Sequence, residues 1–267
     1  MSVQLGSILS DRKPKNQDSE KLGTAYKGFQ SWSMNGMDKI TASGRKHAVH
    51  NFLSLDKGGF MSCSGWDDEV EFNTQCSSQW DSLAHYHHQP TKLAYNGVEC
   101  TQAALEEAAA AKTAGNALPT LDHWHARGCL VGRGVLIDFK QYADDVGIDF
   151  LATGGYRITT EELERAAAHQ GVEFQPGDIL LVRTGFTESV DAIDPDQIRG
   201  SEGIQLSGVH GTEDTAKWLW NKRFAAAASD SAAFEAFPPL KPDGSVTGMD
   251  GLGKSRIQWW QYLGHSC

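Results

Sequence analysis

The chain has 267 residues, of which 40% are hydrophobic and 22% charged. This balance is typical of a globular protein built around one compact domain. Its 24 Lys and Arg residues against 34 Asp and Glu residues give a net charge of −10. That charge argues against nucleic acid and anionic membranes as partners, because both bind basic surfaces. No apolar run approaches the roughly 18 residues of a membrane span.

Residues 1–30 are polar and contain no apolar stretch of the kind found in a secretory signal. We therefore expect a polar N-terminal arm over residues 1–30 and a single domain over residues 31–267. The five cysteines are scattered and show no CxxC spacing. They fit reduced thiols in a cytoplasmic protein.

The first half of the domain has extended character. An apolar pattern that includes Phe52 and Leu53 predicts a strand leading into a turn at residues 58–59. Residues 74–81 show no helical apolar stripe and predict a further strand. Because side chains alternate between the faces of a strand, one face would carry two amides, a hydroxyl and a carboxylate. Those four residues are Gln75, Ser77, Gln79 and Asp81.

Helices and strands alternate in the second half, which indicates an α/β class. Each of three predicted helices begins near a threonine that can cap it: residues 101–115, 159–171 and 212–224. In the second helix Glu162 completes a capping box with Thr159. Apolar runs predict buried strands at residues 130–139, 179–183 and 224–230.

Two histidines, His123 and His125, flank Trp124 just before the first of these strands. On an extended segment both imidazoles would lie on one face and could form a metal-binding pair. The alternative is that they are ordinary polar residues preceding a strand.

The string Phe72–His85, FNTQCSSQWDSLAH, resembles the signature of the cyclase family of hydrolases, which includes kynurenine formamidase and isatin hydrolase. The usual motif is H-x-G-T-H-x-D-x-P-x-H. The resemblance implies that Asp81 is the metal-binding aspartate and His85 the proton-transfer histidine. Gln75 and Gln79 stand where the family has two histidine ligands. The string is similar to a fungal-type branch, F-N-T-Q-x-S-S-Q-W-D-G-L-x-H.

The resemblance implies a single-domain cyclase-like (swivelling β/β/α) fold, with a mixed central sheet or barrel flanked by helices. It also implies a homodimer or homotetramer and places His210 with Asp81 and His85 in the catalytic site. For Trp66 a buried core position is the alternative, and for Arg183 a surface salt bridge. The substrate-binding residues that it implies are Gln75, Gln79, Trp80, Tyr86, Trp66, Trp124, Arg183 and Glu235.

The family pattern is broken at its metal ligands. A glutamine carbonyl is a weaker ligand for Zn²⁺ or Mn²⁺ than a neutral imidazole. Near the C-terminus, Ile257 or Gln258 takes the position of a family histidine, and the chain ends at Cys267 before the family's glutamate. We therefore expect either no metal or a weakly held Zn²⁺ or Mn²⁺ at Asp81 and Gln79.

Three functions remain open. The first is the family chemistry, hydrolysis of an amide, formamide or lactam by an arylformamidase-like enzyme of tryptophan catabolism. The second is a metal-independent cyclase, isomerase or dehydratase of secondary metabolism that uses His85 and Asp81 for proton transfer. The third is a non-catalytic protein that binds a small molecule. In each case the expected ligand is aromatic or cyclic, because eight tryptophans include several near the proposed site.

Overall fold

The computed structural model describes residues 46, 48–56, 63–74, 80–88, 91–111, 116–189, 205–231, 233–240 and 244–245. The chain divides into two units. One comprises residues 1–80 and 193–202, and the other comprises residues 81–192 and 203–267. The predicted N-terminal arm and the C-terminal positions Ile257 and Gln258 lie outside the described residues.

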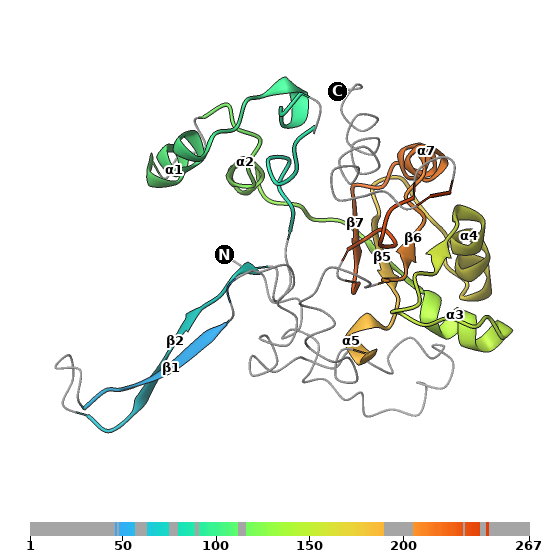
Figure 1. Cartoon of the computed structure of the whole chain (residues 1–267), viewed down its shortest axis with the longest axis horizontal. Coiled ribbons are helices and arrows are strands. Elements are labelled where there is room, and N and C mark those ends of the chain that lie inside the picture. Colours follow the sequence, from blue (N-terminus) through green and yellow to red (C-terminus); the bar gives the residue numbers. More distant parts are fainter. Residues whose placement is uncertain are drawn as a thin grey trace. The chain divides into compact units, whose positions relative to one another are not determined.

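The first unit contains an antiparallel hairpin of β1 (Val49–Ser54) and β2 (Trp66–Glu71), shown in blue and cyan in Figure 1. The predicted first strand is thereby confirmed. Trp66 lies opposite Ser54 and is 70% exposed. The expectation of a buried core tryptophan is therefore wrong, and its part in a substrate pocket stays a prediction.

The strand predicted over residues 74–81 is wrong at both described ends, because β2 already stops at Glu71 and neither Thr74 nor Asp81 is in a strand. Residues 75–79, which include Gln75 and Gln79, lie outside the described residues. After Asp81 the chain forms a turn, in which the backbone N–H of His85 donates to the carbonyl of Ser82 over 3.0 Å. The Ser82 hydroxyl accepts from the next-but-one backbone N–H, a local bond that favours turns over strands.

The second unit is built on a parallel sheet with the order β3-β5-β7. Its strands are β3 (Gly134–Asp138), β5 (Ile179–Arg183) and β7 (Ala226–Ser229), of which β5 and β7 are labelled in Figure 1. The two later strands lie where they were predicted, but β7 has no buried residue, so that its expected burial is wrong. The earlier predicted strand begins too soon, since Val131 is 89% exposed and the strand starts only at Gly134. Along β3 and β5 every second residue is buried, which is the alternation expected of strands.

Helices α3 (Phe139–Val146), α4 (Thr160–His169) and α7 (Glu213–Lys222) lie beside this sheet, toward the right of Figure 1. The capping box of Thr159 and Glu162 is present, and Thr212 caps α7, so both helix starts are confirmed. Helix α3 was not predicted, because it follows β3 without a break. The unit also contains the parallel pair β4 (Arg157–Ile158) and β6 (Gly208–Val209) and the short helix α5 (Phe186–Ser189).

The core of the second unit lies between sheet and helices. Phe139 is fully buried and its ring contacts those of Tyr142, Phe150 and Tyr156. The other side chains with 2% exposure or less include Ile137, Ile158, Leu163, Leu180, Val182 and Val209. The predicted α/β class is confirmed as a mixture of parallel and antiparallel sheets with helices.

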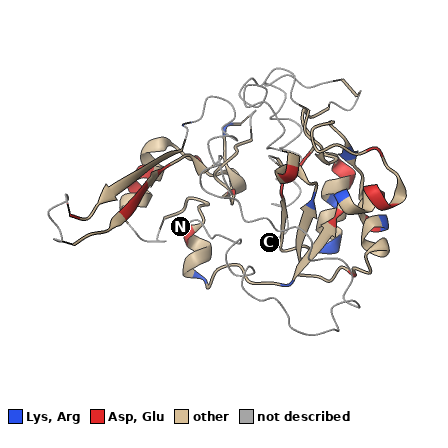
Figure 2. Ribbon diagram, turned by 90° about the horizontal axis from the view of Figure 1, so that it is seen from below, with Lys and Arg blue, Asp and Glu red and all other residues tan. Residues whose placement is uncertain are grey.

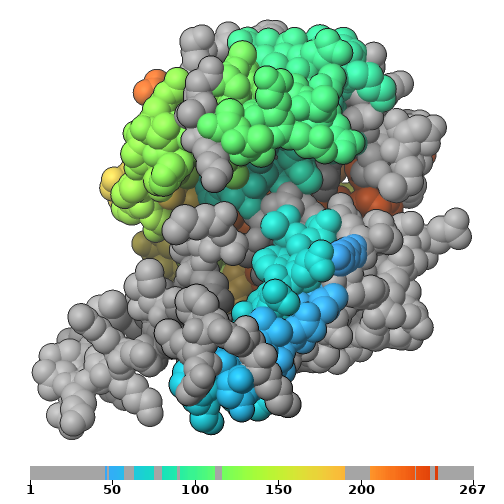
Figure 3. Space-filling view, turned by 90° about the vertical axis from the view of Figure 1, so that its left-hand side faces the viewer, coloured from blue at the N-terminus to red at the C-terminus, as the bar shows by residue number. Residues whose placement is uncertain are grey.

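The segment between His85 and β3 contains the 3₁₀ turn η3 (Tyr95–Gly97) and helices α1 (Gln102–Ala111) and α2 (Asp122–Ala126). The predicted helix after Thr101 is confirmed as far as Ala111, and α1 buries none of its residues. Figure 3 shows the segment, in green, at the molecular surface. Because His123 and His125 lie in a helix, they are about 200° apart around its axis. The one-face metal pair is therefore wrong.

Figure 2 shows basic and acidic residues mixed on the helices beside the parallel sheet. Strand β2, by its sequence, carries four acidic residues. Among the described helices, none is long and apolar enough to cross a membrane. Cys63, Cys100 and Cys129 are free thiols, and burial raises the pKa of Cys100.

Candidate functional site

The turn after Trp80 brings together two of the predicted catalytic residues. His85 Nε2 lies 3.7 Å from Asp81 Oδ1, and the two side chains are 35% and 49% exposed. This distance fits an ion pair but is too long for a hydrogen bond. Contacts between catalytic groups are often long in ligand-free structures and shorten when the substrate binds. The pair can therefore accept and return a proton at a solvent-accessible position.

A cavity of about 350 Å³ adjoins this turn through Leu83. The backbone N–H of Tyr95 donates to the carbonyl of Leu83 over 3.4 Å. The cavity is lined by residues 83, 95, 96, 98, 116–120, 123, 124 and 127. The volume lies in the usual range of small-molecule sites. Trp124, predicted to bind substrate, lines this cavity.

The lining also contains Tyr95 and Arg127, which the sequence did not indicate as site residues, and His123, which it offered only as part of a metal-binding pair. His123 and Arg127 belong to the same HWHAR string as Trp124, so the helical period of that string was the signal that could have found them. Tyr86 is half-buried on the turn, and Trp80 is 42% exposed. Their roles in substrate binding stay predictions.

His210 and Glu235 lie together at the carboxyl end of β6. His210 follows directly after β6, and Val209 forms a parallel bridge with Glu235. The backbone N–H of His210 donates to the carbonyl of Ile158, and its carbonyl accepts from the hydroxyl of Thr215 over 2.7 Å. These bonds fix the histidine between the β4–β6 pair and α7. That it shares a substrate pocket with His85 stays a prediction.

Burial, and secondly the positive charge of Arg157, lower the pKa of His210 below its ordinary value. Arg157 is half-buried, and its guanidinium donates to the backbone carbonyls of Gly155 and Pro238. Burial lowers the pKa of Arg157 as well. The environment therefore favours a neutral imidazole at His210.

We expect this histidine to make the protein less stable in mild acid. The unfolded chain binds a proton at His210 near pH 6.5, whereas the folded chain binds it only at lower pH. The free energy of unfolding should therefore fall as the pH drops from 7.5 through the unfolded pKa to the folded pKa, and this loss should be absent in His210→Asn. Urea unfolding of both proteins between pH 7.5 and pH 5 measures the difference. The same dependence of the unfolding free energy on pH in both proteins would contradict this role of His210.

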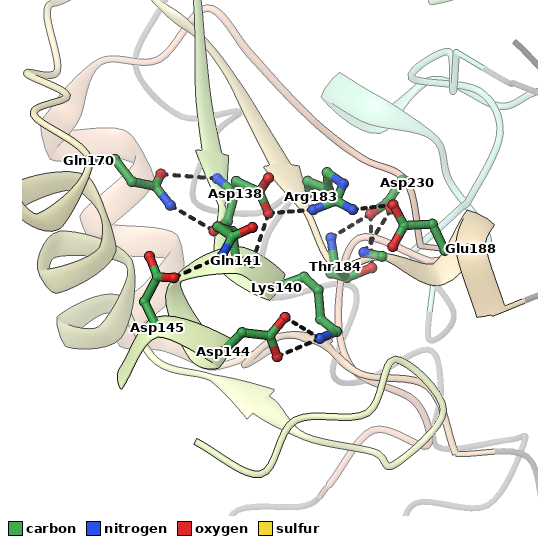
Figure 4. Close-up of polar contacts among 11 residues, drawn as sticks. Asp138, Lys140, Gln141, Asp144, Asp145, Gln170, Arg183, Thr184, Glu188 and Asp230 are labelled. Atoms are coloured by element: carbon green, nitrogen blue, oxygen red, sulfur yellow. Dashed lines mark hydrogen bonds and ion pairs between the residues drawn. The ribbon is translucent and has the colours of Figure 1, made fainter. Parts of the chain in front are cut away.

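Arg183 belongs to a polar network at the carboxyl end of the parallel sheet (Figure 4). Its guanidinium forms ion pairs with Asp138, at 2.6 Å, and with Glu188. Burial opposes the charge of Arg183, yet hydrogen bonds to these carboxylates leave its pKa raised. Arg183 therefore forms a salt bridge, but its side chain is only 18% exposed, so that the alternative of a surface salt bridge is confirmed only in the pairing. Its part in substrate binding stays a prediction.

Asp230, shown in Figure 4, forms hydrogen bonds that hold the loop after β5 in place. Its carboxylate accepts from the N–H and hydroxyl of Thr184, at 2.6 and 2.8 Å, and from the N–H of Gly185 at 2.9 Å. Thr184 is fully buried, so these donors have no access to water.

Replacing Asp230 by Ala should lower the free energy of unfolding by about 2–4 kcal/mol, because buried donors lose their acceptor. Asp230→Asn keeps one carbonyl oxygen for Thr184 and should lose less than half as much. Urea denaturation of the unmodified protein and the two variants measures their free energies of unfolding. A loss as large in Asp230→Asn as in Asp230→Ala would contradict this account of the loop.

A model of the cyclase family matches residues 14–236. The chain belongs to the cyclase family. Among solved structures it is similar to a novel cyclase, with 28% identity and a TM-score of 0.59 over 78% of this chain and 67% of that one. No curated protein matches the chain.

Two further solved structures align less well. An isatin hydrolase bound to the product analogue thioisatinate has 13% identity and a TM-score of 0.49, over 84% of this chain and 72% of that chain. Isatin hydrolase A from Labrenzia aggregata, bound to benzyl benzoate, has 11% identity and a TM-score of 0.44, over 73% and 61% respectively.

In this cyclase-family chain the described donors do not fit a metal centre. Across the described ranges, no group of three or more His, Cys, Asp or Glu side chains is placed to hold an ion. Asp81 lies 3.7 Å from His85, and Gln79 is outside the described residues. A divalent ion needs more strong donors than one carboxylate provides.

Proposed function

We propose that this protein is a hydrolase that opens an amide, formamide or lactam bond, with His85 as general base and Asp81 as its partner. Membership of the cyclase family and the His85–Asp81 contact support the proposal. The observation on which the proposal depends is this contact, because a nearby carboxylate stabilises the imidazolium that a histidine general base becomes in the reaction.

In the proposed reaction His85 removes a proton from water, and the resulting hydroxide attacks the carbonyl carbon. Asp81 stabilises the imidazolium by its negative charge. The C–N bond then breaks, and His85 returns the proton to the departing nitrogen. The products are a carboxylic acid and an amine, so that atoms and charge balance. A positioned general base of this kind accelerates a reaction by about 10² to 10⁴.

The test is turnover of N-aryl formamides and aryl lactams in water enriched in ¹⁸O, with metal content measured on the same preparation. Hydrolysis places one ¹⁸O atom in the acid product. We expect turnover to persist after treatment with a chelator. Chelator-sensitive turnover with stoichiometric metal would contradict a His85 base and point to donors outside the described residues.

The mismatch between the described donors and a metal centre favours a second candidate, a metal-independent cyclase, isomerase or dehydratase that uses the same pair. Its signature in the same experiment is a product without ¹⁸O. Tight binding of a ligand without any turnover would instead support a non-catalytic binding protein.

A further inference from the structure

The cavity beside the catalytic turn combines flat apolar walls with positive charge. Tyr95, Trp124 and Leu83 supply aromatic and aliphatic surface. A cavity of about 150 Å³ can hold a benzene ring, so that about 350 Å³ leaves room for a substituted ring. None of the residues that line the cavity is acidic, although the chain as a whole carries a charge of −10. The cavity lining is therefore basic, whereas the chain as a whole is acidic.

Arg127 and His123 provide the basic groups of this lining. Both lie on or directly after α2, and the side chain of Arg127 is exposed. The nearest acid along the chain, Asp122, accepts a hydrogen bond from Thr120, and this bond is the main cause of its lowered pKa. The guanidinium of Arg127 belongs to none of the ion pairs found among the described residues. It is available to an anion in the cavity.

Asn116 adds a buried hydrogen-bond donor. Its Oδ1 accepts from the backbone N–H of Leu118 over 2.9 Å, which fixes the orientation of the amide. Its Nδ2 is buried and has no hydrogen-bond partner in the described part of the chain. A weak hydrogen-bonding influence of the Asn116 side chain is the smallest of the causes that lower the pKa of Asp122, but Nδ2 and the carboxylate do not meet the geometry of a hydrogen bond. A buried donor without a partner indicates that an acceptor oxygen belongs there.

We propose that this cavity binds an aryl carboxylate, with the ring against Trp124 and Tyr95 and the carboxylate at Arg127 and Asn116. The apolar walls select the ring, and the two donors select the acid. Leu83 lies both in the cavity wall and in the turn that carries Asp81 and His85, so we assign the cavity as the substrate or product site. This assignment rests on the proposed hydrolase function. Arg127 is then the residue that determines specificity for an acidic ring compound.

The test uses 2-aminobenzoate and its neutral counterpart 2-aminobenzamide, which have nearly the same shape. Calorimetric titration of the full chain should show binding of the acid, weakened about tenfold in Arg127→Gln by the loss of one charge-assisted hydrogen bond. The amide should bind weakly and equally to both proteins. Arg165→Gln, which removes an exposed arginine from α4, should bind the acid as the unmodified chain does.

The proposal is overturned if the acid does not bind, if acid and amide bind equally, or if Arg127→Gln leaves the affinity for the acid unchanged. Carrying out the titrations in the His85→Gln background separates this result from the hydrolase proposal. Arg127-dependent binding without turnover of any amide in the unmodified protein supports the cavity and contradicts the hydrolase. Turnover of acidic aryl amides whose KM is the same in Arg127→Gln supports the hydrolase and overturns the cavity assignment.

Discussion

Replacing His85 by Gln should lower kcat for amide hydrolysis by about 10² to 10⁴ while leaving the fold intact. Glutamine is similar in size to histidine but cannot take up a proton at neutral pH. The loss should be confined to kcat, since the proposed ring contacts come from other residues. Stability should change little, because the 3.7 Å contact with Asp81 lies at the surface and such pairs contribute little to folding.

The chain contains a matched control for this experiment. His169 pairs with Asp145 at 3.0 Å, also at the surface, on helix α4. His169→Gln therefore removes a second histidine–aspartate pair and should keep full activity. Full activity in His85→Gln, or an equal loss in both variants, would show that His85 is not the general base. Steady-state kinetics of the two variants decides the matter.

Replacing Gly208 by Ala should lower the free energy of unfolding by about 3 kcal/mol or more. A Cβ atom on this buried residue would lie 2.7 Å from the carbonyl carbon of Glu235, and 2.8 Å from Ala236 N and Phe234 O. All three are backbone atoms and cannot rotate away, so that the β6 segment has to shift. Because His210 follows β6 directly, its NMR titration should also change.

Gly134→Ala is the control for this substitution. Gly134 also begins a strand of the second unit, but a Cβ atom there would lie 3.6 Å from the nearest side-chain carbon, an ordinary contact. Alanine is less costly than glycine to order in a strand, so that this variant should be as stable as the unmodified chain or slightly more stable. Urea denaturation measures both. Similar stabilities for the two variants would contradict the close approach of β6 to residues 234–236.

The sequence alone determined those features that depend on local rules. Threonine caps located the starts of α4 and α7, and an apolar run located β5, because capping and strand alternation act over a few residues. The motif around Asp81 and His85 indicated the family that the matching model shows. The four-residue spacing of the pair also left the two side chains within reach of each other in a turn.

Only the tertiary structure decided how distant segments meet. Arg183 pairs with Asp138, 45 residues away, and Asp230 holds Thr184 across 46 residues, so that neither partner could be found from local pattern. The segment around His123 forms a helix, where an extended segment was considered. The chain after Asp81 forms a turn next to the residues for which a strand was predicted. The cavity likewise joins residue 83 to residues 116–127. Neighbouring residues set the propensity of a segment to form a helix, strand or turn. A site is formed when distant segments pack together, and local sequence patterns do not show which segments will meet.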